Sequence, residues 1–93
     1  MKNIKEIILE VGAGNSGAYT VIKELQWFSY WHEIITWCLK KGIVGFKLWE
    51  LYKDEYKMDS YKLGKYLENE MWKDKEFEHL QKKSRDSEFI NLI

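Results

Sequence analysis

Apolar residues recur every three or four positions along most of this chain, which is the spacing of one face of an α-helix. The first run consists of Ile4, Ile7, Ile8 and Val11. Asn3 precedes this run, and Glu6 follows Asn3 by three residues, which is the pattern of a capping box. We therefore predict a first helix that Asn3 caps.

Three glycines interrupt the pattern in the segment Val-Gly-Ala-Gly-Asn-Ser-Gly-Ala at 11–18. Gly12 suits the left-handed residue just past the end of a helix, and Asn15 suits the N-cap of the next one. The spacing then predicts a second helix that runs to about Phe28. Its apolar face consists of Ala18, Val21, Ile22, Leu25 and Phe28.

An aromatic-rich segment, Gln-Trp-Phe-Ser-Tyr-Trp at 26–31, follows that helix. We predict a break near Ser29, while the pattern leaves open whether the rings from Trp27 to Trp31 lie in the core or at an interface. A third helix is predicted to end at Gly42, after two lysines that suit the helix dipole. Its apolar face is Ile34, Ile35, Cys38 and Leu39.

The segment Gly-Ile-Val-Gly at 42–45 is a second glycine corner, and a further helical run follows it at 46–54. Trp49 and Lys53 share one face of that run because they lie four positions apart. This pair is either an indole packed beside a lysine stem or the wall of a binding site. The other face is Leu48, Leu51 and Tyr52, and its two leucines are predicted core residues.

Asp59 suits the N-cap of a further helix at 60–71, in which Gly64 is a weak point. The apolar face of this helix is Tyr61, Leu63, Tyr66, Leu67 and Met71. A charged helix is predicted at 74–83, with Phe77 and Leu80 facing inward.

A break is predicted at 84–87, and the apolar tail at 89–93 is expected to dock on this chain or on a neighbouring copy, because apolar side chains are costly to leave in water. The chain as a whole predicts an all-α fold. We expect a compact bundle of five or six short helices with glycine corners, in a single domain at 1–93.

The net charge and the aromatic content limit which partners the protein can have. Fifteen basic and fifteen acidic residues give a formal net charge of zero, so no overall field draws the protein to duplex nucleic acid. Near-zero charge suits self-association, and we expect a homo-oligomer. The chain has five Trp, six Tyr and four Phe, which is more aromatic rings than so small a core encloses. We therefore predict that some rings lie at the surface, where they contact a partner, a second copy of the chain or a flat ligand.

Several classes of protein are disfavoured. One cysteine, Cys38, cannot form an internal disulfide, and His32 and His79 lie too far apart in sequence for metal-ligand spacing. No apolar run approaches the roughly 20 residues of a membrane span, and the N-terminus has no secretory pattern, so we expect a cytoplasmic protein. Catalytic triads, paired-carboxylate motifs and cofactor motifs are also missing, which predicts a protein that is not an enzyme and has no cofactor.

The candidate site is a ligand-binding one. The amide groups of Asn15, Ser16 and Gly17, in and just after the first glycine corner, are flanked by small residues and can hold an anion. Gly14, directly before them, is included in the candidate site. A base could stack on Trp49, on Tyr52 or on the cluster Trp27, Tyr30 and Trp31. Lys53 could supply a positive charge. A capped helix start and a packed core also account for each of these features separately.

The segments at 11–18 and 42–54 together resemble a group of small phage- and prophage-encoded proteins of Gram-positive bacteria, which pair a VGxGNPGA-like corner with a GIxGxxLWxLYKD-like segment. The likeness covers about the first 55 residues, and Ser16 stands where those proteins have proline. The resemblance implies a phage origin. A compact phage protein of this kind is typically a counter-defence factor that sequesters a host nucleotide signal or blocks a host protein.

Three functions follow as hypotheses. The first is a sponge for an anionic nucleotide-like signal, and the second is an inhibitor or adaptor that binds a host defence protein through surface aromatics. A helix-turn-helix regulator with its turn at 42–45 is weaker, because the helix after it carries few groups that read bases.

Overall fold

The computed structural model describes residues 2–80, and within them the protein is all-α with no strand. The helices are α1 (Ile4–Gly12), α2 (Ser16–Glu24), α3 (Trp31–Lys41), α4 (Phe46–Glu50) and α5 (Ser60–Trp72). A 3₁₀ turn η1 (Leu25–Trp27) extends α2, a π-helical segment η2 (Leu51–Glu55) extends α4, and 75–80 are helical. The predicted break at 84–87 and the tail at 89–93 lie outside the described residues.

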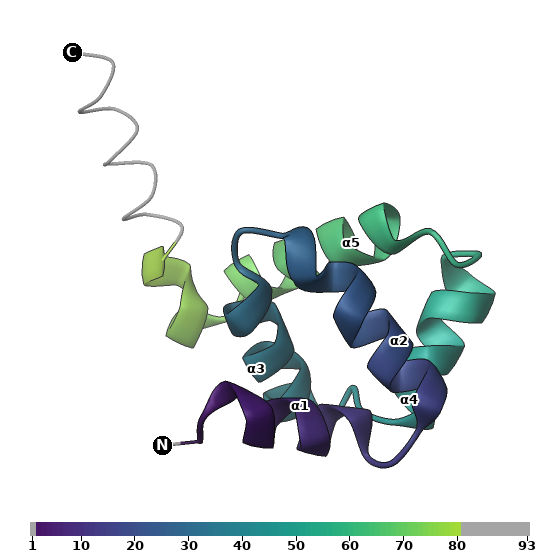
Figure 1. The fold of residues 1–93 in the computed structure, drawn as a ribbon. Coiled ribbons are helices and arrows are strands. Elements are labelled where there is room, and N and C mark those ends of the chain that lie inside the picture. The colour runs from purple at the N-terminus through teal and green to yellow at the C-terminus, as the bar shows by residue number, and fades with distance from the viewer. Residues whose placement is uncertain (1, 81–93) are drawn as a thin grey trace.

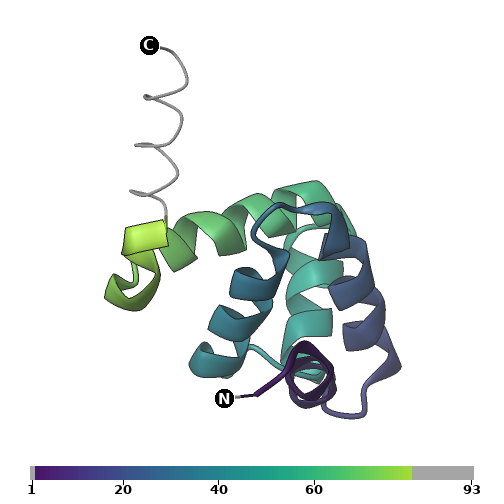
Figure 2. The same ribbon diagram turned by 60° about the vertical axis from the view of Figure 1, so that its left-hand side comes forward.

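The helices pack at steep angles and do not form an up-and-down bundle. In Figures 1 and 2, α1 and α5 lie at opposite ends of the group formed by α2, α3 and α4. The closest packing joins α1 to both α2 and α3, α2 to α4, and α3 to α5. None of the described helices is long and apolar enough to cross a membrane.

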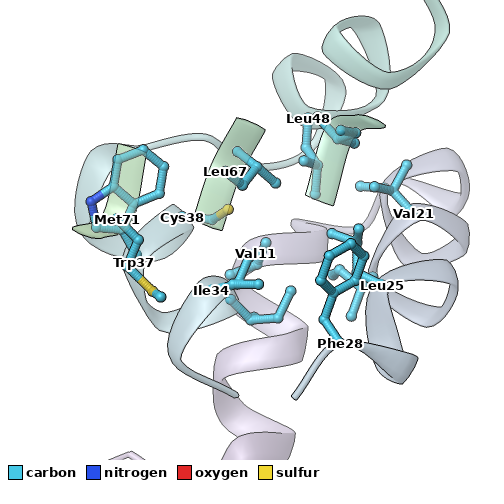
Figure 3. Packing of buried hydrophobic residues seen from close by; sticks show 14 of the residues in the cluster. Val11, Val21, Leu25, Phe28, Ile34, Trp37, Cys38, Leu48, Leu67 and Met71 are labelled. Atoms are coloured by element: carbon cyan, nitrogen blue, oxygen red, sulfur yellow. The ribbon is translucent and has the colours of Figure 1, made fainter. Parts of the chain in front are cut away.

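The core runs through the middle of this group and takes side chains from every helix (Figure 3). Its completely buried members confirm the predicted apolar faces of the first three helices, since Val11, Leu25 and Ile34 expose none of their surface. Leu48, Leu63, Leu67 and Met71 complete it from α4 and α5. Two polar-tipped rings, Trp37 and Tyr52, are also almost fully enclosed.

Local capping signals predicted the helix starts correctly. Asn3, Asn15 and Asp59 each accept a hydrogen bond from a backbone amide three residues later, as an N-cap side chain does. Gly42 ends α3 in the left-handed conformation, with φ +74°. These features depend only on neighbouring residues.

The prediction for Gly12 was wrong. The left-handed residue after α1 is Ala13, with φ +49°, and Gly14 follows at φ +72°. Gly12 is the last residue of α1 and must be glycine for a different reason, because a Cβ there would collide with the ring of Tyr19. Packing therefore determines this position.

The aromatic-rich segment breaks as predicted and divides between core and surface. The second helix ends earlier than predicted, at Glu24, and after η1 the chain becomes extended at Phe28, with ψ 138°. Phe28 is buried, and Trp31 is fixed by its Nε1–H, which donates to the carbonyl of Ile22 at 2.9 Å. Trp27 is 61% exposed.

The helix predicted at 46–54 is not regular. Its second half is the π-helical segment η2, which closes with the amide of Tyr56 donating to the carbonyl of Leu51 at 3.2 Å. A π turn holds more residues than an α turn, so the faces of this segment shift from the predicted ones. Leu51, a predicted core residue, is accordingly only half-buried.

Two expected core residues of α5 lie at the surface. Tyr61 is 54% exposed and Tyr66 is 39% exposed, whereas Leu63, Leu67 and Met71 are buried. Phe77 is buried and Leu80 packs against the core, which confirms the inward face of the last predicted helix as far as residue 80.

Candidate functional site

The start of α2 leaves two backbone amides without an acceptor. The side chain of Asn15 accepts from the amide of Ala18 at 3.0 Å, and its carbonyl accepts from the amide of Tyr19 at 3.1 Å. The amides of Ser16 and Gly17 have no protein acceptor within residues 2–80. They are two of the orphan donors that open every α-helix, and they carry its positive dipole end.

The predicted amide of Asn15 is not available in the same way. It donates to the carbonyl of Gly12 at 2.9 Å, which closes the turn between α1 and α2. The candidate anion site therefore consists of two amides rather than three. Ser16 adds its side-chain hydroxyl beside them.

The indole of Trp49 lies directly against this helix start. A Cβ at Gly17 would lie 2.5 Å from Cδ2 of Trp49, so only glycine lets the ring approach so closely. Together with Phe46 and Thr20, these residues surround a groove of about 500 Å³, which we call the α2 groove. Its complete wall is Asn15, Ser16, Gly17, Thr20, Phe46 and Trp49.

Phe46 and Thr20 were missed by sequence analysis. Phe46 is the first residue of α4 and is 62% exposed, so it forms an aromatic wall that is open to solvent. Its place directly after the second glycine corner was the available signal. Thr20 lies one turn after Ser16 and donates its hydroxyl to the Ser16 carbonyl at 3.1 Å.

Three predicted site residues do not line the α2 groove. Gly14 lies in the turn before it. Tyr52 is a core residue whose ring centroid is 5.9 Å from that of Trp49, and burial, followed by the charges of Glu24 and Asp59, raises its pKa. Lys53 is exposed, and its Nζ lies 3.9 Å from Asp54.

The electrostatics of the α2 groove come from the backbone alone. None of its lining side chains carries a formal charge. Attraction for an anion would therefore rest on the two amides and the dipole of the nine-residue helix α2, which together favour negative charge. The rings of Trp49 and Phe46 add flat apolar surface beside them.

Comparison with protein-family models, with curated proteins and with solved structures found no match. Within residues 2–80, no three His, Cys, Asp or Glu side chains gather in a way that could hold a metal ion. The geometry of the chain itself is therefore the basis for a functional proposal.

Proposed function

We propose that this protein is a non-catalytic binding protein that sequesters an anionic, nucleotide-like ligand in the α2 groove. The observation that carries this proposal is the meeting of two uncommitted amides, at Ser16 and Gly17, with the indole of Trp49 in one groove. The phage resemblance of 11–18 and 42–54 suggests the biological setting, namely removal of a host nucleotide signal in the bacterial cytoplasm.

Each part of the groove has a matching part in a nucleotide. A phosphate would accept from the amides of Ser16 and Gly17 and from the Ser16 hydroxyl. The base would lie on the exposed ring of Phe46 or on the free part of Trp49, where stacking contributes roughly 1–3 kcal/mol per base. A groove of about 500 Å³ is within the size range of small-molecule sites.

Isothermal titration calorimetry with a panel of cyclic and linear nucleotides tests this proposal. We expect saturable heat with at least one member at micromolar protein. The informative variant is Ser16→Glu, because a carboxylate in the first turn of α2 suits the helix dipole but repels a bound phosphate. We expect this variant to keep or gain thermal stability and to lose binding by about tenfold or more.

Gln26→Glu is the matched control, since it adds the same charge at an exposed position of η1 that does not line the groove. It should bind like the unmodified protein. Absence of heat with every nucleotide would contradict the proposal. If Ser16→Glu bound the nucleotide as tightly as the unmodified protein, the α2 groove would be excluded as the binding site.

A second candidate function is inhibition of a host protein, with an exposed aromatic pair as the anchor. The rings of Trp27 and Tyr61 stack with centroids 5.9 Å apart and an interplanar angle of 14°, and more than half of each side chain is exposed. Trp and Tyr dominate the energetics of protein interfaces. This pair comes from η1 and α5.

A pull-down from bacterial lysate distinguishes the two functions. A stoichiometric protein partner that is lost in a Trp27→Ala/Tyr61→Ala double variant would favour the inhibitor. The Ser16→Glu variant should keep that partner. Native mass spectrometry of the purified protein would give the copy number, and thereby test the expected homo-oligomer, together with any co-purified small molecule.

A further inference from the structure

A second groove, of about 750 Å³, lies between the C-terminal half of α3, the α4–η2 segment and α5. We call it the acidic groove, because four carboxylates and two ammonium groups line it. The carboxylates are those of Glu50, Asp54, Glu55 and Glu70, and the ammonium groups are those of Lys41 and Lys47. The groove therefore attracts positive charge.

Two of these carboxylates have no cation of their own. Asp54 and Glu70 each lie within ion-pair distance of a neighbouring lysine. Glu50 and Glu55 form no ion pair with any residue of the described part of the chain. Both belong to the α4–η2 segment, so the unpaired negative charge of the groove lies along one of its walls.

Apolar and aromatic side chains complete the wall of the acidic groove, and they are incompletely covered. Leu51, which the sequence pattern predicts as a core residue, is only half-buried, and so is Ile43. The rings of Tyr56 and Tyr66 lie with centroids 5.4 Å apart, and Tyr66 is 39% exposed. An apolar segment that covered this surface would gain free energy by removing it from water.

The sequence that follows the described residues has both properties. Three of the five residues at 81–85 are basic, and the run Phe-Ile-Asn-Leu-Ile follows at 89–93. Two acidic residues, at 86 and 88, leave the stretch 81–88 with a net charge of +1. The basic residues and the apolar run therefore match the two kinds of surface that the acidic groove offers.

The chain also passes the edge of the acidic groove shortly before residue 81. Glu70 lines the groove from α5, and Asp74 lies 3.6 Å from Nζ of Lys41, which lines it from α3. The nine residues that lead from residue 80 to Phe89 span up to about 30 Å when extended. A segment of the same chain acts at an effective concentration on the order of millimolar, which a separate cationic molecule would have to match. Connectivity therefore selects this segment among the cationic occupants of the groove.

We propose that the segment 81–93 of this chain covers the acidic groove. The basic side chains at 82–85 pair with Glu50 and Glu55. The apolar run at 89–93 covers Leu51. This inference does not depend on the function proposed for the α2 groove, because the two grooves share no lining residue.

Cross-linking of the full chain with a carbodiimide tests this proposal, because the reagent joins a lysine directly to a carboxylate that it contacts. Equal amounts of unlabelled and ¹⁵N-labelled protein are mixed, so that mass spectrometry separates links within one chain from links between two copies. We expect the lysines at 82–83 to be linked to Glu50 or Glu55 within one chain. The contact between Lys40 and Asp74, at 2.8 Å, is the positive control for the reaction.

The variant Phe89→Ser/Ile90→Ser keeps both lysines and removes two apolar side chains, so we expect it to lower the yield of these links about tenfold. Asn91→Ser, a polar change in the same run, is the matched control and should leave the yield unchanged. An equal yield in the unmodified protein and in Phe89→Ser/Ile90→Ser would overturn the proposal.

The pattern of links gives three further ways to reject the proposal. The first is a set of links from 82–83 that reach the exposed Glu6 and Glu10 of α1 as often as they reach Glu50 and Glu55. The second is the absence of links to the groove while the positive control reacts. The third is a majority of links between unlabelled and labelled chains, which would place the segment on a neighbouring copy.

Discussion

Three glycines of this fold are required because an aromatic ring packs directly on them. Tyr19 lies on Gly12, Trp49 lies on Gly17, and Phe28 lies on Gly64. In each pair the ring comes from another part of the chain, so the glycine fixes how closely two segments approach. The second of these contacts, between Trp49 and Gly17, forms a wall of the α2 groove.

The variant Gly64→Ala measures the strength of such a contact. Alanine favours a helix over glycine by about 1 kcal/mol, whereas its methyl group would overlap the ring of Phe28, and overpacking of a core costs about 1–3 kcal/mol. We expect the packing cost to exceed the gain and the free energy of unfolding to fall by up to about 2 kcal/mol in urea denaturation. Asn69→Ala, at an exposed position of α5, is the control and should stay within about 0.5 kcal/mol. A stabilised Gly64→Ala would show that the Phe28 ring yields easily.

Asp74 joins two elements of the fold. Its Oδ1 accepts from the amide of Glu76 at 3.0 Å, at the start of the helix at 75–80. Its carboxylate also lies 2.8 Å from Nζ of Lys40, in the last turn of α3. The hydrogen bond from Lys40, followed by that from the Glu76 amide, lowers the pKa of Asp74 below its ordinary value of 3.8. The pKa of Lys40 is raised above 10.5, chiefly by the same hydrogen bond.

The pair should therefore stabilise the fold only while both groups are charged. A lowered carboxyl pKa gives stability that is present above pH 3.8 and is lost as the pH falls through the folded pKa. The raised lysine pKa gives stability that is lost as the pH rises above 10.5. We expect Asp74→Asn, which keeps a capping side chain and removes the charge, to unfold at lower urea than the unmodified protein at pH 7.

That difference should shrink as the pH falls from 3.8 through the lowered pKa of Asp74, where the carboxylate of the folded protein becomes protonated as well. Asp54→Asn, which removes the same charge from an exposed side chain, should show a smaller effect at pH 7. A difference between Asp74→Asn and the unmodified protein that does not vary with pH would mean that capping, and not charge, is the contribution of Asp74.

Local signals predicted the helices well and the site only in part. The caps at Asn15 and Asp59 follow from hydrogen bonds within three residues, so the sequence contains the whole cause. The open amides at Ser16 and Gly17 follow from the same rule. The segment η2 is π-helical where the sequence predicts a regular helix, and Lys53, which was predicted on the same face as Trp49, does not line the α2 groove.

Long-range contacts were the information that the sequence pattern lacked. Gly64 looks like a weak point when only helix propensity is considered, and the ring that makes it necessary lies 36 positions away at Phe28. The acidic groove of about 750 Å³, which Trp37 lines, has the same origin, because its walls come from α3, α4, η2 and α5. The sequence alone predicted only a solvated face for the carboxylates of this groove, because it did not show which aromatic side chains lie beside them.

The thiol of Cys38 can serve as a probe of global unfolding. It exposes none of its surface, and burial raises the pKa of its thiol from 9.0 to about 12. The reactive thiolate is therefore almost absent in the folded protein at pH 8, and a thiol reagent reaches it only when the core opens. We expect no labelling by dithionitrobenzoate in the native protein over minutes and complete labelling in urea.

The slow native labelling rate should then follow the free energy of unfolding. Gly64→Ala should speed labelling, and a nucleotide that binds the folded α2 groove should slow it about tenfold when its free concentration is about ten times its Kd. Ser16→Glu should be slowed only about twofold or less at the same nucleotide concentration, because this variant keeps the fold and binds about tenfold or more weakly. Fast labelling of the unmodified native protein would mean that the helices around Cys38 open separately from the rest, and the thiol would then measure local rather than global stability.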